Sequence, residues 1–387
     1  MITNINQLKQ EEIRGKKVLV RVDFNVPIKD GVVVDDYRIT RALPTIEFLR
    51  RSGAKVLLIS HIETKDVDVP TLKPVHTLLS QTIPVSFIED CFSDEARQGI
   101  DMLEESEVIL FENIRRYEGE KKNDEEFGKK LAGLADIYVN DAFAVSHRSH
   151  ASIVGVPKYI SGYAGLLLAD EISHLKIDDH TPHPFLFILG GAKFETKLPL
   201  IEKFLDKADK IFIGGALAND LLRLKGVDVK SSLVSTMSTM SGIVDNPDAT
   251  ENPLQHALQK LLTNPKVMIP EDVVWDGDKI MDAGPKDLLA LKPHIMSAKY
   301  ILWNGPLGNY ENGFKSGTVA LSKLIGESSA QSVVGGGDTL ASIKELNLMD
   351  KFTFISTGGG AMLDFLLAGT LVGIDALDGH LSRLSRP

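Results

Sequence analysis

The sequence predicts an α/β protein built from two doubly wound (Rossmann-like) parallel sheets, on two observations. Short runs rich in Val and Ile recur along the whole chain, and most are apolar at consecutive positions rather than at alternating ones. This pattern is typical of strands buried on both faces of a parallel sheet. The segments between the runs are long enough for helical crossovers, so each sheet is expected to carry helices on both faces.

The apolar runs define the expected strands. They are Val18–Val22, Val56–Ile59, Val108–Phe111, Ile137–Val139, Phe185–Leu189, Ile211–Ile213, Val267–Ile269, Tyr300–Trp303, Ser332–Val334 and Phe352–Ile355. One spacer illustrates the expected helices, because leucines from Leu254 to Leu262 repeat on one helical face and Pro253 suits the first turn.

A chain of 387 residues is expected to form two domains, since single cores rarely grow beyond about 250–300 residues. Residues 163–177 are expected to be helical, and the polar, proline-containing stretch 178–184 reads as a joint. We therefore expect a first domain over 1–168, an inter-domain helix and linker over 169–184, and a second domain from 185. The Ser-, Thr- and Met-rich stretch 231–252 is expected to be a loop.

Composition excludes several classes of protein. The net charge of −10 disfavours broad nucleic-acid binding, and a single cysteine, Cys91, rules out a disulfide framework. The N-terminal residues are polar and no apolar stretch is long enough to span a membrane, so a cytoplasmic protein without a membrane partner is expected. The Walker A loop, the dinucleotide fingerprint and the zincin and protein-kinase signatures are absent from the sequence.

Polar or glycine clusters follow most of the expected strands, at the sheet edge where ligands bind in parallel α/β folds. In the first half these residues are Asp23, Asn25, Ser60, His61, Glu112, Asn113, Arg115, Asn140, Asp141 and Arg148, with Arg38 after the first strand. Such arginine, histidine and asparagine side chains suit a small anion. Taken singly, each has a plainer interpretation, such as a surface ion pair or a structural histidine.

The second half offers glycine turns whose bare N–H groups and helix dipoles suit phosphates. The residues are Gly190, Gly191, Lys193, Gly214, Gly215, Asn304, Gly305, Gly335–Gly337, Asp338 and Gly358–Gly360. A glycine pair alone is commonly a tight turn, and Asp338 alone could be a helix N-cap. Pro199 places a helix start near itself, so Lys193 and Lys197 would lie at its positive end, where cations cost about 0.3–1 kcal/mol each. A phosphate held there would explain both lysines.

These residues also stand in motifs that resemble the phosphoglycerate kinase family over nearly the whole chain. The run Val18–Pro27 carries the R-x-D-x-N-x-P signature as Arg21, Asp23, Asn25 and Pro27. Further matching segments are Glu112–Arg115, Tyr138–Phe143, His147–Ser152, Ile188–Lys193, Trp303–Gly308, Gly335–Asp338 and Ile355–Ala361.

The resemblance implies residue roles. Binding of 3-phosphoglycerate is implied for Asp23, Asn25, Arg38, His61, Arg115 and Arg148, and catalysis for Arg38, Lys193 and Lys197. Nucleotide binding is implied for Lys197, Gly214, Gly215, Asn304, Glu311, Gly336, Gly337, Asp338 and Thr339. Asp338 would coordinate Mg²⁺ with ATP or ADP. The partners would be 3-phosphoglycerate or 1,3-bisphosphoglycerate and ATP or ADP, bound by a monomer.

The implied chemistry is an in-line phosphoryl transfer. A carboxylate is already a nucleophile, so no general base is required, and positioning and electrostatic stabilisation suffice. A hinge bend about residues 165–184 would bring the two half-sites together. The resemblance also implies that the C-terminal segment, through Ile374–Leu377, crosses back to the first domain. The domains would then be 1–168 with 374–387, and 185–373.

The chain departs from the family pattern at three places. After the second strand it reads Glu63-Thr64-Lys65, where a Gly-Arg pair is usual. A lost charge-assisted bond of about 1.5–3 kcal/mol would weaken substrate binding roughly 10- to 150-fold, unless Lys65 reaches the same phosphate. Phe354 replaces a common histidine, and the tail Gly379–Pro387 runs past the usual end. Two alternatives stay open, a kinase for another small carboxylate or carbamate, and a weakly active nucleotide-binding scaffold.

Overall fold

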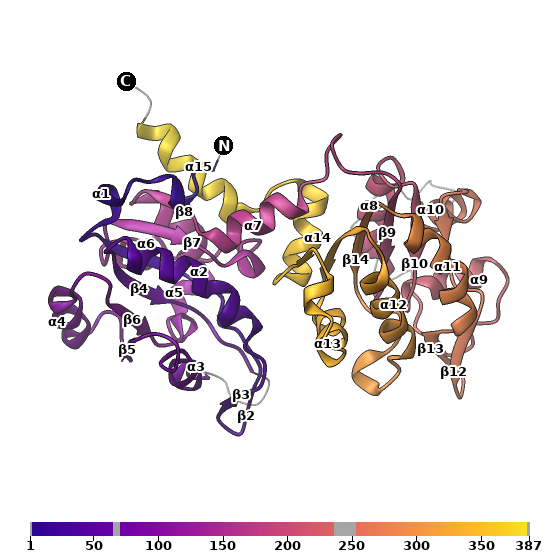
Figure 1. The fold of residues 1–387 in the computed structure, drawn as a ribbon, viewed down its shortest axis with the longest axis horizontal. Coiled ribbons are helices and arrows are strands. Elements are labelled where there is room, and N and C mark those ends of the chain that lie inside the picture. Colours follow the sequence, from indigo (N-terminus) through magenta and orange to yellow (C-terminus); the bar gives the residue numbers. More distant parts are fainter. Residues whose placement is uncertain (1, 65–69, 236–252, 385–387) are drawn as a thin grey trace. The chain divides into compact units, whose positions relative to one another are not determined.

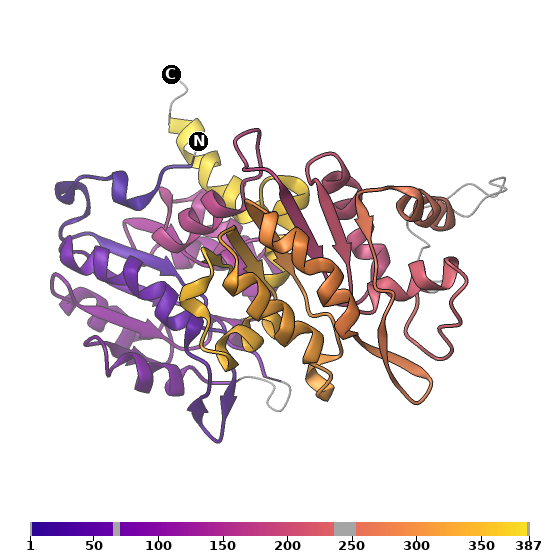
Figure 2. The same cartoon turned by 45° about the vertical axis from the view of Figure 1, so that its right-hand side comes forward.

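The computed structural model describes residues 2–64, 70–235 and 253–384. The chain forms two compact units, and each is described by itself. Unit 1 comprises Met1–His174 and Ala368–Pro387, and unit 2 comprises Leu175–Leu367. Figure 1 labels the elements, and Figure 2 shows from a second direction that helices flank the strands in each unit.

Unit 1 is built on one six-stranded sheet in which every neighbouring pair is parallel. In spatial order its strands are β5 (Ser86–Ile88), β6 (Val108–Phe111), β4 (Lys55–Ile59), β1 (Lys17–Arg21), β7 (Ile137–Asn140) and β8 (Gly162–Ala164). The register sets Val20 opposite Leu58 on one side and Val139 on the other. All three side chains are fully buried, as the continuous apolar runs predict for central parallel strands.

Helices and short turns connect these strands. The α-helices of unit 1 are α1 (Gln10–Ile13), α2 (Tyr37–Arg51), α3 (Lys73–Leu79), α4 (Asp94–Met102), α5 (Glu118–Lys122), α6 (Glu125–Ala132), α7 (Leu166–Leu175) and α15 (Val372–Leu384). The shorter elements are η1 (Ile5–Gln7), η2 (Ile114–Arg116), η3 (Phe143–Val145), η4 (Ala151–Gly155), η5 (Val156–Lys158) and the hairpin β2 (Ile28–Lys29) with β3 (Val32–Val33). The longest α-helix of unit 1, α2, packs its buried Ile39, Ile46 and Leu49 into the core beside the sheet.

Unit 2 repeats the plan with a second six-stranded parallel sheet. Its strand order is β11 (Val267–Met268), β10 (Lys210–Ile213), β9 (Phe185–Leu189), β14 (Tyr300–Asn304), β15 (Gln331–Gly335) and β16 (Phe354–Ile355). Its helices are α8 (Phe194–Leu205), α9 (Leu217–Leu224), α10 (Pro253–Thr263), α11 (Pro285–Ser297), α12 (Ser316–Glu327), α13 (Gly337–Glu345) and α14 (Gly359–Ala368). A hairpin of β12 (Val273–Asp276) and β13 (Lys279–Ala283), with η7 (Tyr310–Asn312) and η8 (Met349–Lys351), completes it.

The predicted fold class is confirmed, and every predicted apolar run forms a strand to within two residues at either end. The sequence prediction missed the sheet-edge strands β5 and β8 and both hairpins. Each of these four has too few buried apolar residues to stand out as a run. The C-terminal segment packs on unit 1, where Ile374 and Leu377 are buried and Gly373 N–H donates to Ser146 O at 2.8 Å. The domain boundaries expected from the sequence stay predictions.

Two expected helix boundaries are wrong. Helix α8 begins at Phe194, not near Pro199, which therefore lies inside it. Burial of Phe194, Leu198 and Ile201 against the sheet outweighs the one hydrogen bond that the proline cannot donate. Helix α7 spans Leu166–Leu175 rather than 163–177, because the first residues of that stretch pair as β8.

The structure describes only some of the other residues for which the sequence made predictions. Lys65 and most of the predicted loop 231–252 lie outside the described residues. Phe354 is buried in β16, and the backbone of the tail continues α15 as far as Leu384. Within the described ranges no single helix is long and apolar enough to cross a membrane, although α14 and the first part of α15 pass that test as a bent pair on length and composition.

Candidate active site

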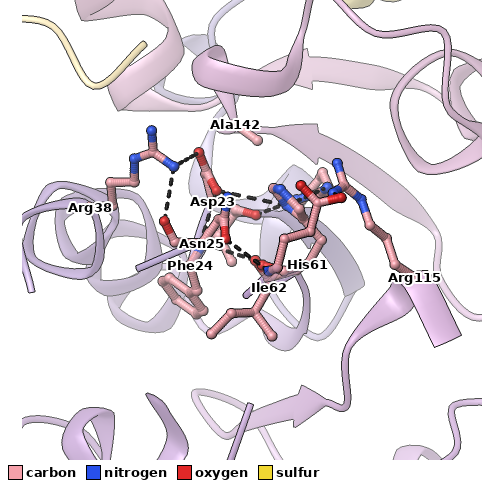
Figure 3. A network of polar contacts seen from close by, with 12 residues as sticks. Asp23, Phe24, Asn25, Arg38, His61, Ile62, Arg115 and Ala142 are labelled. Carbon is pink, nitrogen blue, oxygen red and sulfur yellow. Dashed lines mark hydrogen bonds and ion pairs between the residues drawn. The ribbon is translucent and has the colours of Figure 1, made fainter. Parts of the chain in front are cut away.

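The first cluster lies in unit 1, at the carboxyl ends of the central strands. Asp23 follows β1, is buried, and its Oδ2 lies 3.1 Å from Nη1 of Arg38 on α2. The same Nη1 donates to the main-chain oxygen of Asn25 at 3.0 Å, and Asn25 N–H donates to Asp23 Oδ1 at 3.1 Å. Figure 3 shows Arg38 reaching Asp23 and Asn25 from one side of this network. The carboxylate and the main-chain oxygen of Asn25 thus fix the position of the Arg38 guanidinium.

His61 lies beyond the end of β4 and is 1% exposed. Its Nδ1 lies 3.2 Å from Arg21 Nη2 and 3.8 Å from Asp23 Oδ1. Burial, followed by the charges of Arg21 and Arg115, lowers the pKa of His61 well below its usual value. The imidazole is therefore neutral at pH 7, and Nδ1 accepts from Arg21.

Arg115 lies on η2, beyond the end of β6, and its side chain is 3% exposed. Its Nη1 forms an ion pair with Glu63 Oε1, and Lys121 Nζ lies 3.6 Å from the same oxygen. Arg115 Nε and Nη2 have no hydrogen-bond partner among the described residues. Burial lowers the pKa of Arg115 from its ordinary value, although a guanidinium stays charged at neutral pH.

A buried network supports these side chains from behind. Arg21 is fully buried at the end of β1, and its Nε donates to Ser152 Oγ at 2.9 Å. Ser152 in turn donates through Oγ and N–H to Glu120 at 2.6 and 2.8 Å. The pKa of the neighbouring His150 falls to about 4 because of burial and the charges of nearby arginines. Burial, and then the charges of nearby arginines, keep both histidines neutral at pH 7.

Sequence reasoning placed these residues in one site, and the structure brings Asp23, Asn25, Arg38 and His61 together by direct contacts. Arg148 follows η3, is exposed, and its Nε lies 3.5 Å from His147 Nε2. Its charge is among the smaller causes that lower the pKa of His61 and of Glu63.

The second cluster lies in unit 2, where glycine turns follow β9, β10 and β14. Gly190 N–H donates to Asn304 O at 2.8 Å, Gly191 N–H to Pro306 O at 2.9 Å, and Gly214 N–H to Leu189 O at 2.9 Å. A Cβ on Gly190 would lie 2.2 Å from Pro306 O, and one on Gly215, at φ +61°, would lie 2.7 Å from Gly191 N. Only glycine allows these loops to approach so closely.

The two lysines differ in their settings. Lys193 is exposed at the N-cap of α8 with φ 64°, and Lys197 lies in the first turns of the helix. Lys197 Nζ donates to Gly190 O at 2.8 Å, and burial lowers the pKa of Lys197 to about 8. An ammonium has three donors, so Lys197 can also bind an anion beside the glycine turn.

Helix α13 begins with the glycine-rich turn after β15. Gly336 is the N-cap with φ 110°, and Asp338 is the second helical residue. The alternative that Asp338 caps the helix is wrong, because α13 has no side-chain capping bond. Burial, and then the charge of Glu311, raise the pKa of Asp338. Thr339 Oγ1 is buried and has no partner among the described residues.

A cavity of about 610 Å³ lies beside these turns, within the usual size of small-ligand sites. Of the predicted nucleotide residues, Gly215, Glu311 and Asp338 line it. Gly214, Asn304 and Thr339 are buried and do not line it, and Lys197, Gly336 and Gly337 do not line it either. Asn219, which sequence reasoning did not select, also lines the cavity, and its buried Oδ1 has no described partner.

Two parallel sheets, one ending in an arginine cluster and one in a glycine-lined cavity, define an α/β protein with a candidate ligand site on each unit. The family model for phosphoglycerate kinase matches residues 8–369. The phosphoglycerate kinase of Dictyoglomus turgidum is 43% identical, over 96% of this chain and 98% of that protein. The enzyme of Rubrobacter xylanophilus is 42% identical, over 95% and 96%.

Solved structures agree with the sequence comparisons. Phosphoglycerate kinase from Pyrococcus horikoshii superposes with a TM-score of 0.83 at 32% identity, covering 99% of this chain and all of that one. The enzyme from Coxiella burnetii gives 0.79 at 33% identity over the same shares. The chain belongs to the phosphoglycerate kinase family, and it is a phosphotransferase with a carboxyl acceptor.

Sequence reasoning missed two parts of the unit 1 site. Arg21 entered the sequence analysis only as part of the R-x-D-x-N-x-P signature, with no role assigned. In the structure it joins His61 to the buried Ser152 and Glu120. Glu63 was noted as a departure, but its contact with Arg115 was not foreseen. The available signal was an acidic residue shortly after a strand, in a set of strand ends whose other polar groups suit an anion.

Proposed function

We propose that this protein transfers a phosphoryl group between 1,3-bisphosphoglycerate and ADP, reversibly giving 3-phosphoglycerate and ATP. The observation that carries the proposal is the buried Asp23–Arg38–His61 cluster at the end of one sheet, combined with the glycine-lined cavity at the end of the other. Family membership supports the same reaction.

The unit 1 cluster would hold the phosphoglycerate. Its guanidinium groups, Arg38, Arg115 and Arg148, match the several negative charges of this substrate. Asp23 holds Arg38 in place, while Asn25 and His61 offer neutral hydrogen-bonding groups. Because its pKa is lowered well below the usual value and its Nδ1 already accepts from Arg21, His61 suits substrate positioning and not proton removal.

The reacting carboxylate needs no general base, so the proposed catalysis rests on charge stabilisation. Arg38, Lys193 and Lys197 would surround the phosphoryl group in transfer. Lys197 is suited to this role, because its ammonium is already desolvated and therefore interacts more strongly with a developing negative charge.

The nucleotide would occupy the cavity of unit 2, with its phosphates near the first turns of α8 and α13. Asp338 fits a metal–nucleotide complex, because Mg²⁺ commonly takes one or two carboxylates together with phosphate oxygens. The described residues contain no cluster of three or more metal-binding side chains, so the phosphates would supply the remaining ligands. When bound, Mg²⁺ would neutralise charge on the nucleotide phosphates.

Direct transfer requires both substrates at one place, so we propose closure about residues 165–184 as part of the reaction cycle. A closed site also excludes water, which would otherwise accept the phosphoryl group. The family expectation of a cytoplasmic monomer belongs to the same proposal.

The test is a coupled assay with 3-phosphoglycerate and Mg-ATP. Turnover with this substrate, and none with acetate, aspartate or carbamate, supports the proposal over a kinase for another carboxylate. Normal ADP binding without turnover at millimolar substrate would instead favour the scaffold alternative. Arg38→Ala should abolish most activity, whereas Arg97→Ala, which removes an exposed arginine on α4, is the matched control.

A further inference from the structure

The side chain of Glu63 lies against Arg115 in the unit 1 cluster. Its Oε1 forms the ion pair with Arg115 Nη1, and Lys121 Nζ lies 3.6 Å away. No other ion pair to Arg115 is present among the described residues. Of Arg38, Arg115 and Arg148, the most buried, Arg115, is therefore paired with a carboxylate of the same chain.

The main chain holds Glu63 in this position. Glu63 N–H donates to Asn25 Oδ1 at 2.9 Å, and the preceding Ile62 N–H and O bond to the side-chain amide of Asn113 at 3.3 and 2.9 Å. Both asparagines follow strands of the sheet, so the backbone at residue 63 is fixed independently of its carboxylate. Substitution of the side chain should leave the loop intact.

The charge state of Glu63 supports the contact. Burial alone would raise the pKa of Glu63, but the hydrogen bond and charge of Arg115, with Lys121 and Arg148, hold the pKa below its ordinary value. The group is thus an anion at neutral pH. The side chain of Glu63 is 43% exposed, so it can swing away into solvent or toward Lys121 when another anion arrives.

We infer that Glu63 is an internal competitor for the phosphoglycerate site, and that substrate binding requires its carboxylate to leave Arg115. This inference rests on the proposed function, because it assumes that phosphoglycerate binds at Arg115. An internal competitor reduces the fraction of protein that is competent to bind. The apparent affinity for every anion that needs Arg115 falls by the same factor. Glu63 therefore sets the affinity of the site without contacting the substrate.

The test compares Glu63→Gln with the wild type by calorimetric titration of 3-phosphoglycerate in the absence of nucleotide. A partly exposed ion pair contributes little, so the dissociation constant should fall about 3- to 10-fold in the variant. The KM for 3-phosphoglycerate should fall by a similar factor, and the KM for ATP should not change. Glu105→Gln is the matched control, because Glu105 is 45% exposed and pairs with Arg14 away from the site.

A second variant separates contact from charge. Glu63→Asp keeps the negative charge but shortens the side chain by one methylene, so it should also tighten binding. If it behaves as the wild type while Glu63→Gln tightens binding, a general field effect replaces direct competition, and the inference is wrong. Equal or weaker binding in Glu63→Gln would also overturn it, since Glu63 would then be a bystander or a support for Arg115.

The thermal response gives an independent readout. Without added ligand, the Glu63→Gln variant lacks the ion pair and should melt at a lower temperature than the wild type. Saturating 3-phosphoglycerate should raise the melting temperature of the variant more than that of the wild type. Wild-type turnover tests the proposed function separately. If 3-phosphoglycerate is neither turned over nor bound, that function fails, and the ratio of dissociation constants for inorganic phosphate still tests competition by Glu63.

Discussion

Replacing Lys197 with methionine should stabilise unit 2 and inactivate the enzyme, and the stability effect should depend on pH. Burial lowers the pKa of Lys197 from 10.5 to about 8. At 1.36 kcal/mol per pKa unit, holding the charged ammonium costs about 3 kcal/mol at pH 7. The hydrogen bond to Gly190 O offsets roughly half of this or more, so the net gain at pH 7 should be about 1 kcal/mol.

The pH dependence is the sharper measurement. The cost is present in full below the folded pKa of about 8 and disappears as the pH rises through the unfolded value of 10.5. Wild-type stability should therefore rise relative to Lys197→Met by about 2–3 kcal/mol between pH 7 and 10. Urea unfolding at both pH values gives this difference directly, and groups common to both proteins cancel.

Lys210→Met is the matched control, because Lys210 also donates to one main-chain carbonyl, Pro265 O, but from an exposed position. The difference between the two variants isolates the effect of burial. Turnover of Lys197→Met should fall about 10²- to 10³-fold, as expected when one charge-stabilising donor is removed. A constant stability difference between pH 7 and 10 would show that the ammonium is not desolvated and would refute the reasoning.

Three further predictions concern the same sites. Gly190→Ala should cost about 1–3 kcal/mol in urea unfolding, because its Cβ would meet two main-chain oxygens within 2.6 Å, whereas Gly337→Ala, with open space around its Cβ, should cost less than half as much. Asp338→Asn should raise the KM for Mg-ATP about tenfold and leave 3-phosphoglycerate binding by calorimetry unchanged, and an equal effect on both would contradict a metal role. Arg38→Ala should lower kcat about 10²- to 10³-fold. It should also destabilise unit 1 by roughly 1–3 kcal/mol, because buried Asp23 loses its ion-pair partner. A variant of wild-type stability would show that Asp23 gains another partner.

The central strands were predictable because their signal is local. A run such as Val108–Phe111 is apolar at every position, and only burial on both faces explains that pattern. The edge strand Gly162–Ala164 carries no such run, since it has only three residues and two of them are Gly162 and Ala164. The start of α8 was mispredicted because the local rule for Pro199 was outweighed by tertiary burial, which a local rule does not contain.

The candidate site likewise contains residues whose placement was predictable from the sequence and contacts that were not. Positions directly after strands were predictable, since parallel topology alone gathers Asp23, His61 and Arg115 at one edge. The ion pair between Glu63 and Arg115 was not predictable, because it joins two loops whose proximity depends on β4 lying beside β6. The burial of Lys197 likewise depends on how the glycine turns pack around it.

The path of the chain has a consequence for how the protein is made. Residues 175–367 form unit 2 as one continuous stretch, whereas unit 1 is completed only by the segment that buries Ile374 and Leu377. During synthesis, the ribosome therefore releases all of unit 2 before unit 1 has its last helix. Unit 1 is therefore the first unit to begin and the last to be completed, and the apolar residues near β8 stay uncovered by α15 through most of elongation.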